Sequence, residues 1–243
     1  MITSKDNKTI KLIDKIKQKK YSRELSLCFV ESIKIVKQLY NQNLVDTIIL
    51  SEDKQNLIKT FNGCRIEVVS NNIAKYISDS VSFDGVMAIA KISPQNIADY
   101  SKCIILDNIQ DPSNLGAIIR SARAFGYNTI LAINSVYPYT FKCIRSSMGY
   151  IFDINYIDIT FNQLIELKEN SKLSIISADM NGISLDNFTK PSGNYAIVIG
   201  NEGNGVSDEM LKLSDSVISI PMMNNVESLN ASVSASILMF NLK

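Results

Sequence analysis

Apolar and polar positions follow one another along this chain in short blocks that predict alternating strands and helices. In the first 100 residues the blocks predict strands at 45–50, 65–69 and 85–90, and helices at 31–41, 55–60 and 72–78. The helix at 31–41 places Ile33, Val36 and Leu39 on one face. Such alternation predicts a small α/β sandwich.

The remaining chain alternates more regularly. Strands are predicted at 103–106, 129–133, 151–156, 173–177, 195–199 and 217–220, and helices at 114–125, 141–147, 161–170, 207–213 and 228–242. These strands are continuously apolar, which is typical of a parallel sheet covered on both faces. Ligands of such sheets bind beyond the carboxyl ends of the strands, so the loops that follow the strands are the candidate sites.

A boundary between two domains is expected near residue 92. The stretch 92–96 is polar, contains Pro94 and follows an apolar strand. Glycine is unevenly spread as well, because only Gly63 and Gly85 precede residue 100. We therefore expect one domain at residues 1–92 and a second at 98–243.

Composition excludes several classes of function. The chain has no histidine, so Ser-His-Asp triads and histidine-bound metals are excluded. Its four cysteines lie far apart without a Cys-x-x-Cys pair, and we interpret them as small hydrophobic side chains in a reducing cytoplasm. No apolar run approaches the roughly 20 residues that cross a bilayer, and the N-terminus does not resemble a secretory signal. We expect a cytoplasmic protein without a metal or membrane partner.

Charge is distributed unevenly although the net charge is only +1. The first 23 residues carry eight basic and two acidic side chains. A basic segment of this kind predicts a polyanionic partner such as RNA. A solvated, disordered arm is the alternative interpretation.

Polar residues are concentrated in three loops that follow predicted strands. In the first, Ser113 or Asn114 is expected to cap a helix that also carries Arg120 among apolar neighbours. The second loop, 200–205, reads Gly-x-x-Gly-x-Gly, which is neither the Rossmann nor the P-loop pattern, and Ser207 is expected to cap the helix after it. The third, 220–232, brings more hydroxyl and amide side chains to a helix start than capping needs.

In their order and spacing these loops resemble the motifs of the SpoU/TrmH family of RNA ribose 2′-O-methyltransferases. The resemblance lies in residues 114–126 (NLGAIIRSARAFG), 200–205 (GNEGNG), and 220–222 (IPM) followed by 228–230 (SLN). Residues 145–150 (RSSMGY) are similar to a family segment between the first two motifs. Residues 1–90 resemble, more loosely, the L30e-like substrate-binding domain of many members.

The resemblance implies a particular fold and cofactor. The C-terminal domain would be a parallel α/β sheet with a deep trefoil knot, formed by the segments that carry the second and third motifs. This knot would hold S-adenosylmethionine and pack against a second subunit in a homodimer. The implied cofactor-binding residues are Gly200, Asn201, Ile220 and Leu229. The apolar C-terminal helix fits a role in the core or in the dimer.

The resemblance also implies catalytic residues, with Arg120 at the centre and Asn114, Glu202, Ser228 and Asn230 around it. A guanidinium stays protonated in proteins and is therefore a poor general base. We expect Arg120 to bind the phosphate beside the target ribose and to align the nucleophile. Water or a weak acceptor would take the proton, and Glu202 would orient the loop or Arg120.

The implied activity is methyl transfer to a ribose 2′-hydroxyl, and the extra N-terminal domain favours a guanosine in 23S rRNA as the target. A tRNA ribose methyltransferase is the alternative within the family. A catalytically inactive RNA-binding protein is a further alternative, against which the intact polar motif residues argue. A nucleotide-binding protein that uses the 200–205 loop for NAD or ATP is the alternative from another class.

Overall fold

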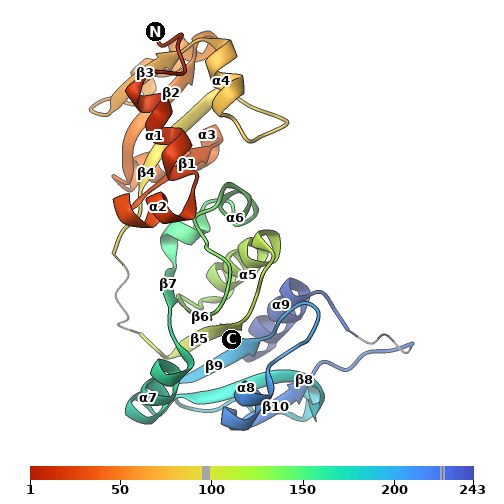
Figure 1. Ribbon diagram of the computed structural model, residues 1–243. Helices are drawn as coiled ribbons and strands as arrows, with labels where there is room; N and C mark the ends of the chain where they lie inside the picture. Colours follow the sequence, from red (N-terminus) through yellow and green to blue (C-terminus); the bar gives the residue numbers. More distant parts are fainter. Residues whose placement is uncertain (95–98, 225, 227) are drawn as a thin grey trace. The chain divides into compact units, whose positions relative to one another are not determined.

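The computed structural model describes residues 1–94, 99–224, 226 and 228–243 (Figure 1). Gln95 and Asn96 of the expected linker, the expected boundary at residue 98, and Asn225 and Glu227 of the third loop lie outside the described residues. The chain forms two compact units. The first contains Met1–Pro94 together with Tyr139–Phe152, and the second contains Gln95–Pro138 and Asp153–Lys243.

The first unit is built on a four-stranded sheet with the order β1-β4-β2-β3. Its strands are β1 (Leu27–Glu31), β2 (Val45–Ser51), β3 (Arg65–Val69) and β4 (Val86–Lys91). β4 pairs antiparallel with β1 and β2, whereas β2 and β3 are parallel. Around the sheet lie α1 (Lys8–Ile16), α2 (Lys19–Leu25), α3 (Ile33–Asn41), η1 (Glu52–Thr60), α4 (Asn71–Ile77), α6 (Phe141–Ser146) and η2 (Tyr150–Asp153).

The basic N-terminal segment is folded, and the interpretation as a disordered arm is wrong. Helix α1 buries Ile10, Ile13 and Ile16 against the sheet, in one cluster with Phe29 and Met87. The lysines between these isoleucines remain on the exposed side of the helix. The expected helix at 31–41 also begins later, because the start of that range belongs to strand β1.

The second unit contains a six-stranded sheet with the order β10-β8-β9-β5-β6-β7, and all of its pairings are parallel. The strands are β5 (Lys102–Asp107), β6 (Thr129–Ile133), β7 (Asn155–Asp158), β8 (Ser174–Ser184), β9 (Tyr195–Ile199) and β10 (Ser216–Ser219). The α/β fold with a parallel sheet is therefore confirmed. The short helix η3 (Leu185–Asn187) follows β8.

Helices cover both faces of this sheet, as the continuously apolar strands predict. Figure 1 shows α5 (Pro112–Phe125) and α9 (Ala231–Leu242) on one face, and α7 (Phe161–Ser171) and α8 (Asp208–Leu213) on the other. In β5, Cys103 and Ile105 join the cluster under α7 and α8. Ile104 and Leu106, which alternate with them, are equally buried.

Two strands differ from the prediction. The apolar stretch at 151–156 is split between the 3₁₀ helix η2 and strand β7, because Ile151 and Tyr156 are buried in different units. Strand β8 continues seven residues past the predicted end at Ser177, along a polar stretch that the apolar pattern excludes. In this extension β10 approaches so closely that a Cβ at Gly182 would lie 2.6 Å from the Ile218 carbonyl carbon.

Three of the four cysteines are buried and all four are free, in agreement with their interpretation as small hydrophobic side chains. Burial raises the pKa of the Cys103 thiol to about 12, so it stays a thiol at neutral pH. No helix in the described part of the chain is long and apolar enough to span a bilayer.

Candidate active site

Three loops meet at the carboxyl ends of strands β5, β9 and β10. The side chain of Asn201, after β9, donates to the Asn108 carbonyl after β5 (2.8 Å). The Asp107 carboxylate, which ends β5, accepts a hydrogen bond from the Ser207 backbone N–H (2.7 Å). Because β5 and β9 are parallel neighbours in the sheet, the topology itself brings their loops together.

Glu202 is the centre of the polar contacts between these loops. Its carboxylate accepts hydrogen bonds from the Asn114 side chain (3.0 Å) and from the backbone N–H groups of Asp111 (3.2 Å) and Gln110 (3.4 Å). The Asn201 side chain donates a further bond of 3.4 Å. Glu202 therefore ties the loop after β9 to the first turn of α5.

The same network reaches the start of helix α9. The Asn230 amide donates to the Asn114 side-chain oxygen (3.0 Å), and Asn114 in turn donates to Glu202. The Asn230 side-chain oxygen also caps α9 by accepting from the Ser232 backbone N–H (2.9 Å). Asn230, Asn114 and Glu202 thus form one chain of hydrogen bonds across all three loops.

Capping of helix α5 differs from the prediction. The cap is Asp111, whose side chain accepts from the Ser113 backbone N–H, and Pro112 occupies the first helical position. Neither Ser113 nor Asn114 is the capping residue. This arrangement leaves the Asn114 side chain available to Glu202 and Asn230. The predicted cap of α8 by Ser207 is confirmed.

Hydrogen bonding lowers the pKa of Glu202. Burial alone raises it, but the bonds from Asn114 and from backbone N–H groups, including those of Asp111 and Gln110, outweigh that effect. The carboxylate is therefore ionised at neutral pH and a weaker base than an ordinary glutamate. Its chemistry suits a role in orienting the loops.

A pocket of about 300 Å³ lies between β8, β9 and the loops after β9 and β10. All four residues expected to bind the cofactor line it: Gly200, Asn201, Ile220 and Leu229. Glu202 and Ser228, expected in the catalytic group, line it as well. The sequence pattern missed the contribution of Asp179 and its neighbours, because they lie in the polar extension of β8.

The shape of the loop at 200–205 depends on Gly200. A Cβ there would lie 2.2 Å from the Gly205 carbonyl carbon and 2.3 Å from the Val206 nitrogen. Asn201 and Gly205 exchange two backbone hydrogen bonds (2.9 and 3.0 Å) that close the loop. The Asn201 side-chain oxygen holds it further by accepting from the Gly203 and Asn204 N–H groups (2.9 and 3.1 Å).

Arg120 lies on α5, six residues after Asn114, and its side chain is exposed. That spacing corresponds to about 9 Å along the helix axis. Within the described residues, no hydrogen bond or ion pair joins its guanidinium to another group. The structure thus connects Arg120 to the network through helix α5 alone, and leaves its five donors available to a ligand.

The pocket suits a ligand that combines an apolar ring with a positive charge. Ile199, Ile218, Ile220 and Leu229 supply apolar walls, and Asp179 and Glu202 supply negative charge. Backbone groups of the 200–205 loop are the remaining polar partners. This chemistry fits S-adenosylmethionine, which carries an adenine ring and a sulfonium cation.

Fold and site together define an α/β protein whose ligand pocket is formed by loops at the carboxyl ends of a parallel sheet. The sequence profile of the SpoU rRNA Methylase family matches residues 101–240. This match covers more than half of the chain, including every predicted site residue. The chain belongs to the SpoU rRNA methylase family.

Named relatives and solved structures agree with this assignment. The 23S rRNA (guanosine(2553)-2'-O)-methyltransferase RlmP of Bacillus subtilis (strain 168) is 25% identical over 245 residues, which cover 100% of this chain and 98% of the relative. The AdoMet-bound rRNA methyltransferase from Sinorhizobium meliloti has a TM-score of 0.88 at 22% identity, covering 99% of this chain and 96% of that chain. AviRb from Streptomyces viridochromogenes, in complex with AdoMet, has a TM-score of 0.87 at 18% identity, with 97% of each chain covered. The family activity is S-adenosylmethionine-dependent methylation of an RNA ribose 2′-hydroxyl, and this chain is an enzyme of that class.

Proposed function

We propose that this enzyme methylates a guanosine ribose in 23S rRNA. The observation that carries the proposal is the similarity to RlmP, which extends over the whole length of both chains and so includes the N-terminal unit. A basic helical surface in that unit supports an RNA substrate. Helices α1 and α2 present Lys11, Lys15, Lys19, Lys20 and Arg23 to solvent.

In functional terms we assign substrate binding to residues 1–92 and methyl transfer to 98–243, apart from Tyr139–Phe152, which belong to the first unit. We place the cofactor in the pocket lined by Gly200, Asn201, Ile220 and Leu229. Family membership implies the deep trefoil knot, which would involve the loops after β9 and β10. When bound, S-adenosylmethionine supplies an activated methyl group on a sulfonium cation.

The side chains of this site are suited to positioning. We assign Arg120 to the phosphate next to the target ribose, because its planar guanidinium is exposed and forms bidentate bonds with phosphate oxygens. Asn114, Asn230 and Glu202 keep α5, α9 and the 200–205 loop in register. Ser228 lines the pocket, and we assign it to contact with the substrate sugar or the cofactor. Correct placement of reactants supplies several kcal/mol of a barrier reduction.

Removal of the proton from the 2′-hydroxyl does not require a strong base. As the methyl group is transferred, the 2′-oxygen becomes cationic and its proton becomes strongly acidic. Glu202, whose pKa is lowered, remains a hydrogen-bond acceptor for the loops, and water takes the proton. Arg120 keeps its charge throughout, which retains its hold on the phosphate.

We further propose that the enzyme is a cytoplasmic homodimer. Helix α9 carries apolar side chains on both its buried and its exposed side, with Ala235 and Leu238 buried while Val233 and Phe240 are 46% and 54% exposed. Exposed apolar side chains on an otherwise core-forming helix fit an interface with a second copy.

The test of the substrate is a comparison of 2′-O-methyl positions in total RNA from cells with and without the gene. We expect one guanosine position in 23S rRNA to lose its methyl group in the absence of the gene. Loss at a tRNA position would instead identify a tRNA methyltransferase. An unchanged methylation map, with a purified protein that binds S-adenosylhomocysteine but transfers no methyl group, would identify an inactive RNA-binding member.

A further inference from the structure

The first unit contains a second pocket, with a volume of about 240 Å³. It lies between the end of β1, the loop that precedes β4, and helix α6, all of which belong to that unit. Its lining includes Glu31, Phe83, Asp84, Phe141 and Arg145. The methyl-transfer site described above uses none of these residues.

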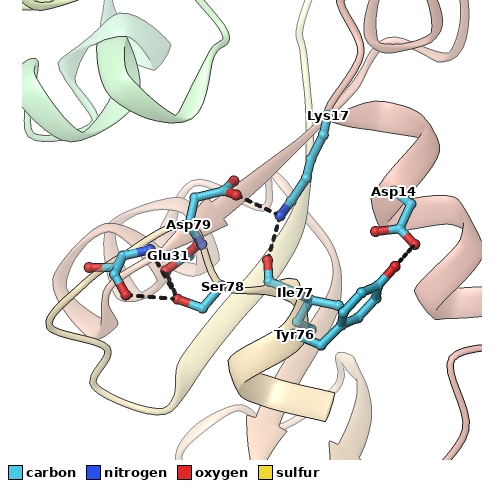
Figure 2. A network of polar contacts seen from close by, with 8 residues as sticks. Asp14, Lys17, Glu31, Tyr76, Ile77, Ser78 and Asp79 are labelled. Atoms are coloured by element: carbon cyan, nitrogen blue, oxygen red, sulfur yellow. Dashed lines mark hydrogen bonds and ion pairs between the residues drawn. The ribbon is translucent and has the colours of Figure 1, made fainter. Parts of the chain in front are cut away.

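Glu31 supplies a buried carboxylate to this pocket. The residue is only 6% exposed, and its two oxygens accept hydrogen bonds from the Ser78 hydroxyl (2.8 Å) and the Asp79 backbone N–H (2.6 Å) (Figure 2). A carboxylate offers about four acceptor positions, so two remain for a ligand. Burial raises the pKa of Glu31, which shows that the charged form lacks full compensation.

Neighbouring contacts hold this carboxylate in place. The ammonium of Lys17, the C-cap residue of α1, forms an ion pair with Asp79 (3.0 Å) and so fixes the segment that donates to Glu31 (Figure 2). Asp84, on the other side of the pocket, uses its two oxygens for the backbone N–H groups of Ile33 (2.9 Å) and Val86 (3.1 Å). Asp84 keeps acceptor capacity as well, but its side chain is exposed to water, whereas Glu31 is the buried carboxylate of this pocket.

Arg145 supplies a cation to the same pocket. Its guanidinium donates to the hydroxyls of Ser80 (2.7 Å) and Ser82 (3.4 Å) and lies 5.9 Å from the centre of the Phe141 ring. In the described part of the chain Arg145 has no carboxylate within ion-pair distance. Both hydrogen-bond partners are neutral hydroxyls, so the guanidinium can still form an ion pair with an anionic ligand.

Two half-buried aromatic rings, Phe83 and Phe141, complete the lining. The volume is smaller than that of typical pockets for drug-sized ligands, about 300–1,000 Å³, and suits a single planar nucleobase. Unpaired RNA bases bind in this way, stacked on aromatic side chains and hydrogen-bonded along one edge. An acceptor, a cation and aromatic rings together match the parts of one nucleotide.

We propose that this pocket binds one unpaired guanine nucleotide of the RNA substrate, with the base edge on Glu31 and the phosphate on Arg145. Guanine presents two adjacent donors, N1–H and the 2-amino group, which match a carboxylate, whereas uracil presents only one N–H between two carbonyls. The proposal rests on the proposed function, because it requires an RNA substrate. It adds a specificity-determining site outside the methyl-transfer pocket.

Titration of the full-length protein with nucleotides, followed by NMR, tests the proposal. The protein is saturated with S-adenosylhomocysteine, and guanosine 5′-monophosphate is compared with uridine 5′-monophosphate. We expect guanosine monophosphate to shift the backbone amide signals of Phe83, Asp84 and Arg145, and to bind about tenfold more tightly than uridine monophosphate.

Two variants test which side chain contacts the base and which contacts the phosphate. Glu31→Gln should reduce the affinity for guanosine monophosphate to that for uridine monophosphate, and Arg145→Ala should weaken both nucleotides to the same extent. Glu24→Gln, which removes an exposed carboxylate from α2, is the matched control and should change neither. Unchanged affinity for S-adenosylhomocysteine verifies that each variant is folded.

The proposal is overturned if guanosine monophosphate shifts no signal of the pocket, or if Glu31→Gln binds it as the wild type does. Failure here is distinguishable from failure of the proposed function. A wild-type enzyme that methylates 23S rRNA but shows no nucleotide binding in this pocket refutes the pocket alone. A protein that binds the guanine nucleotide here but methylates no ribosomal RNA refutes the proposed substrate alone.

Discussion

The substitution Gly200→Ala is the sharpest perturbation of the proposed cofactor pocket. The added methyl group would lie 2.2 Å from the Gly205 carbonyl carbon and 2.3 Å from the Val206 nitrogen. Both are backbone atoms, so no side-chain rotation relieves the clash. Carbon atoms prefer separations of about 3.5–4.0 Å, so the 200–205 loop must retreat by more than about 1 Å.

The expected cost follows from the contacts that this retreat breaks. Overpacking costs about 1–3 kcal/mol, and the two hydrogen bonds between Asn201 and Gly205 are lost in addition. At about 0.5–1.5 kcal/mol for each hydrogen bond, we expect the free energy of unfolding to fall by about 2–6 kcal/mol in total. Because the same loop lines the pocket, the affinity for S-adenosylhomocysteine should fall at least about tenfold, which corresponds to about 1.4 kcal/mol.

Gly203→Ala is the matched control in the same loop. Its Cβ would meet only the Asn201 side-chain oxygen, at 3.5 Å, which is an ordinary contact. We expect its stability to change by less than about 0.5 kcal/mol. Because Gly203 also lines the pocket, its cofactor affinity should fall by less than that of Gly200→Ala. Urea denaturation and isothermal titration calorimetry measure both quantities. Wild-type affinity for S-adenosylhomocysteine in Gly200→Ala would refute the assignment of this pocket to the cofactor.

Three further predictions follow from other parts of the molecule. Arg120→Lys should lower the rate of methyl transfer at least about tenfold with unchanged affinity for S-adenosylhomocysteine, since an ammonium lacks the planar fork; a near-normal rate across pH contradicts the phosphate clamp. Burial raises the pKa of Glu31, so the folded protein favours the protonated form of this side chain. The stability that results is fully present below the ordinary pKa of a glutamate and is lost as pH rises through the folded-state pKa. Glu31→Gln should flatten that pH dependence in urea titrations from pH 4.5 to 7.5, and an unaltered slope counts against the buried charge. Val233→Asp should convert the proposed dimer to a monomer in light scattering, and a monomeric wild type would rule the dimer out.

Most of the catalytic unit could be predicted from the sequence because its signals are local. Continuously apolar strands such as 195–199 indicated the parallel sheet, and that topology places the following loops at one edge. The expected cofactor residues Gly200, Ile220 and Leu229 do line one pocket. Their roles in binding remain a prediction that the variants above test.

Features that depend on tertiary contacts could not be predicted in the same way. Lysine charge in the first 20 residues obscured the i, i+3 spacing of Ile10, Ile13 and Ile16, which places α1 in the core. The polar extension of β8 carries no apolar pattern that would predict a strand. Its register against β10 also shifts between Val217 and Ile218, which only the folded sheet reveals. Glu31 lies at a strand end, and only the folded unit shows that it is buried and lines the same pocket as Arg145.

Methyl transfer to purified 23S rRNA from isotopically labelled S-adenosylmethionine, followed by nucleoside analysis, tests the central claim most directly. The claim is that the loops after β5, β9 and β10 hold the methyl donor beside an RNA ribose. The account predicts label in 2′-O-methylguanosine, with the signal lost in Gly200→Ala and retained in Gly203→Ala. Label on a base, or equal transfer by both glycine variants, would contradict it.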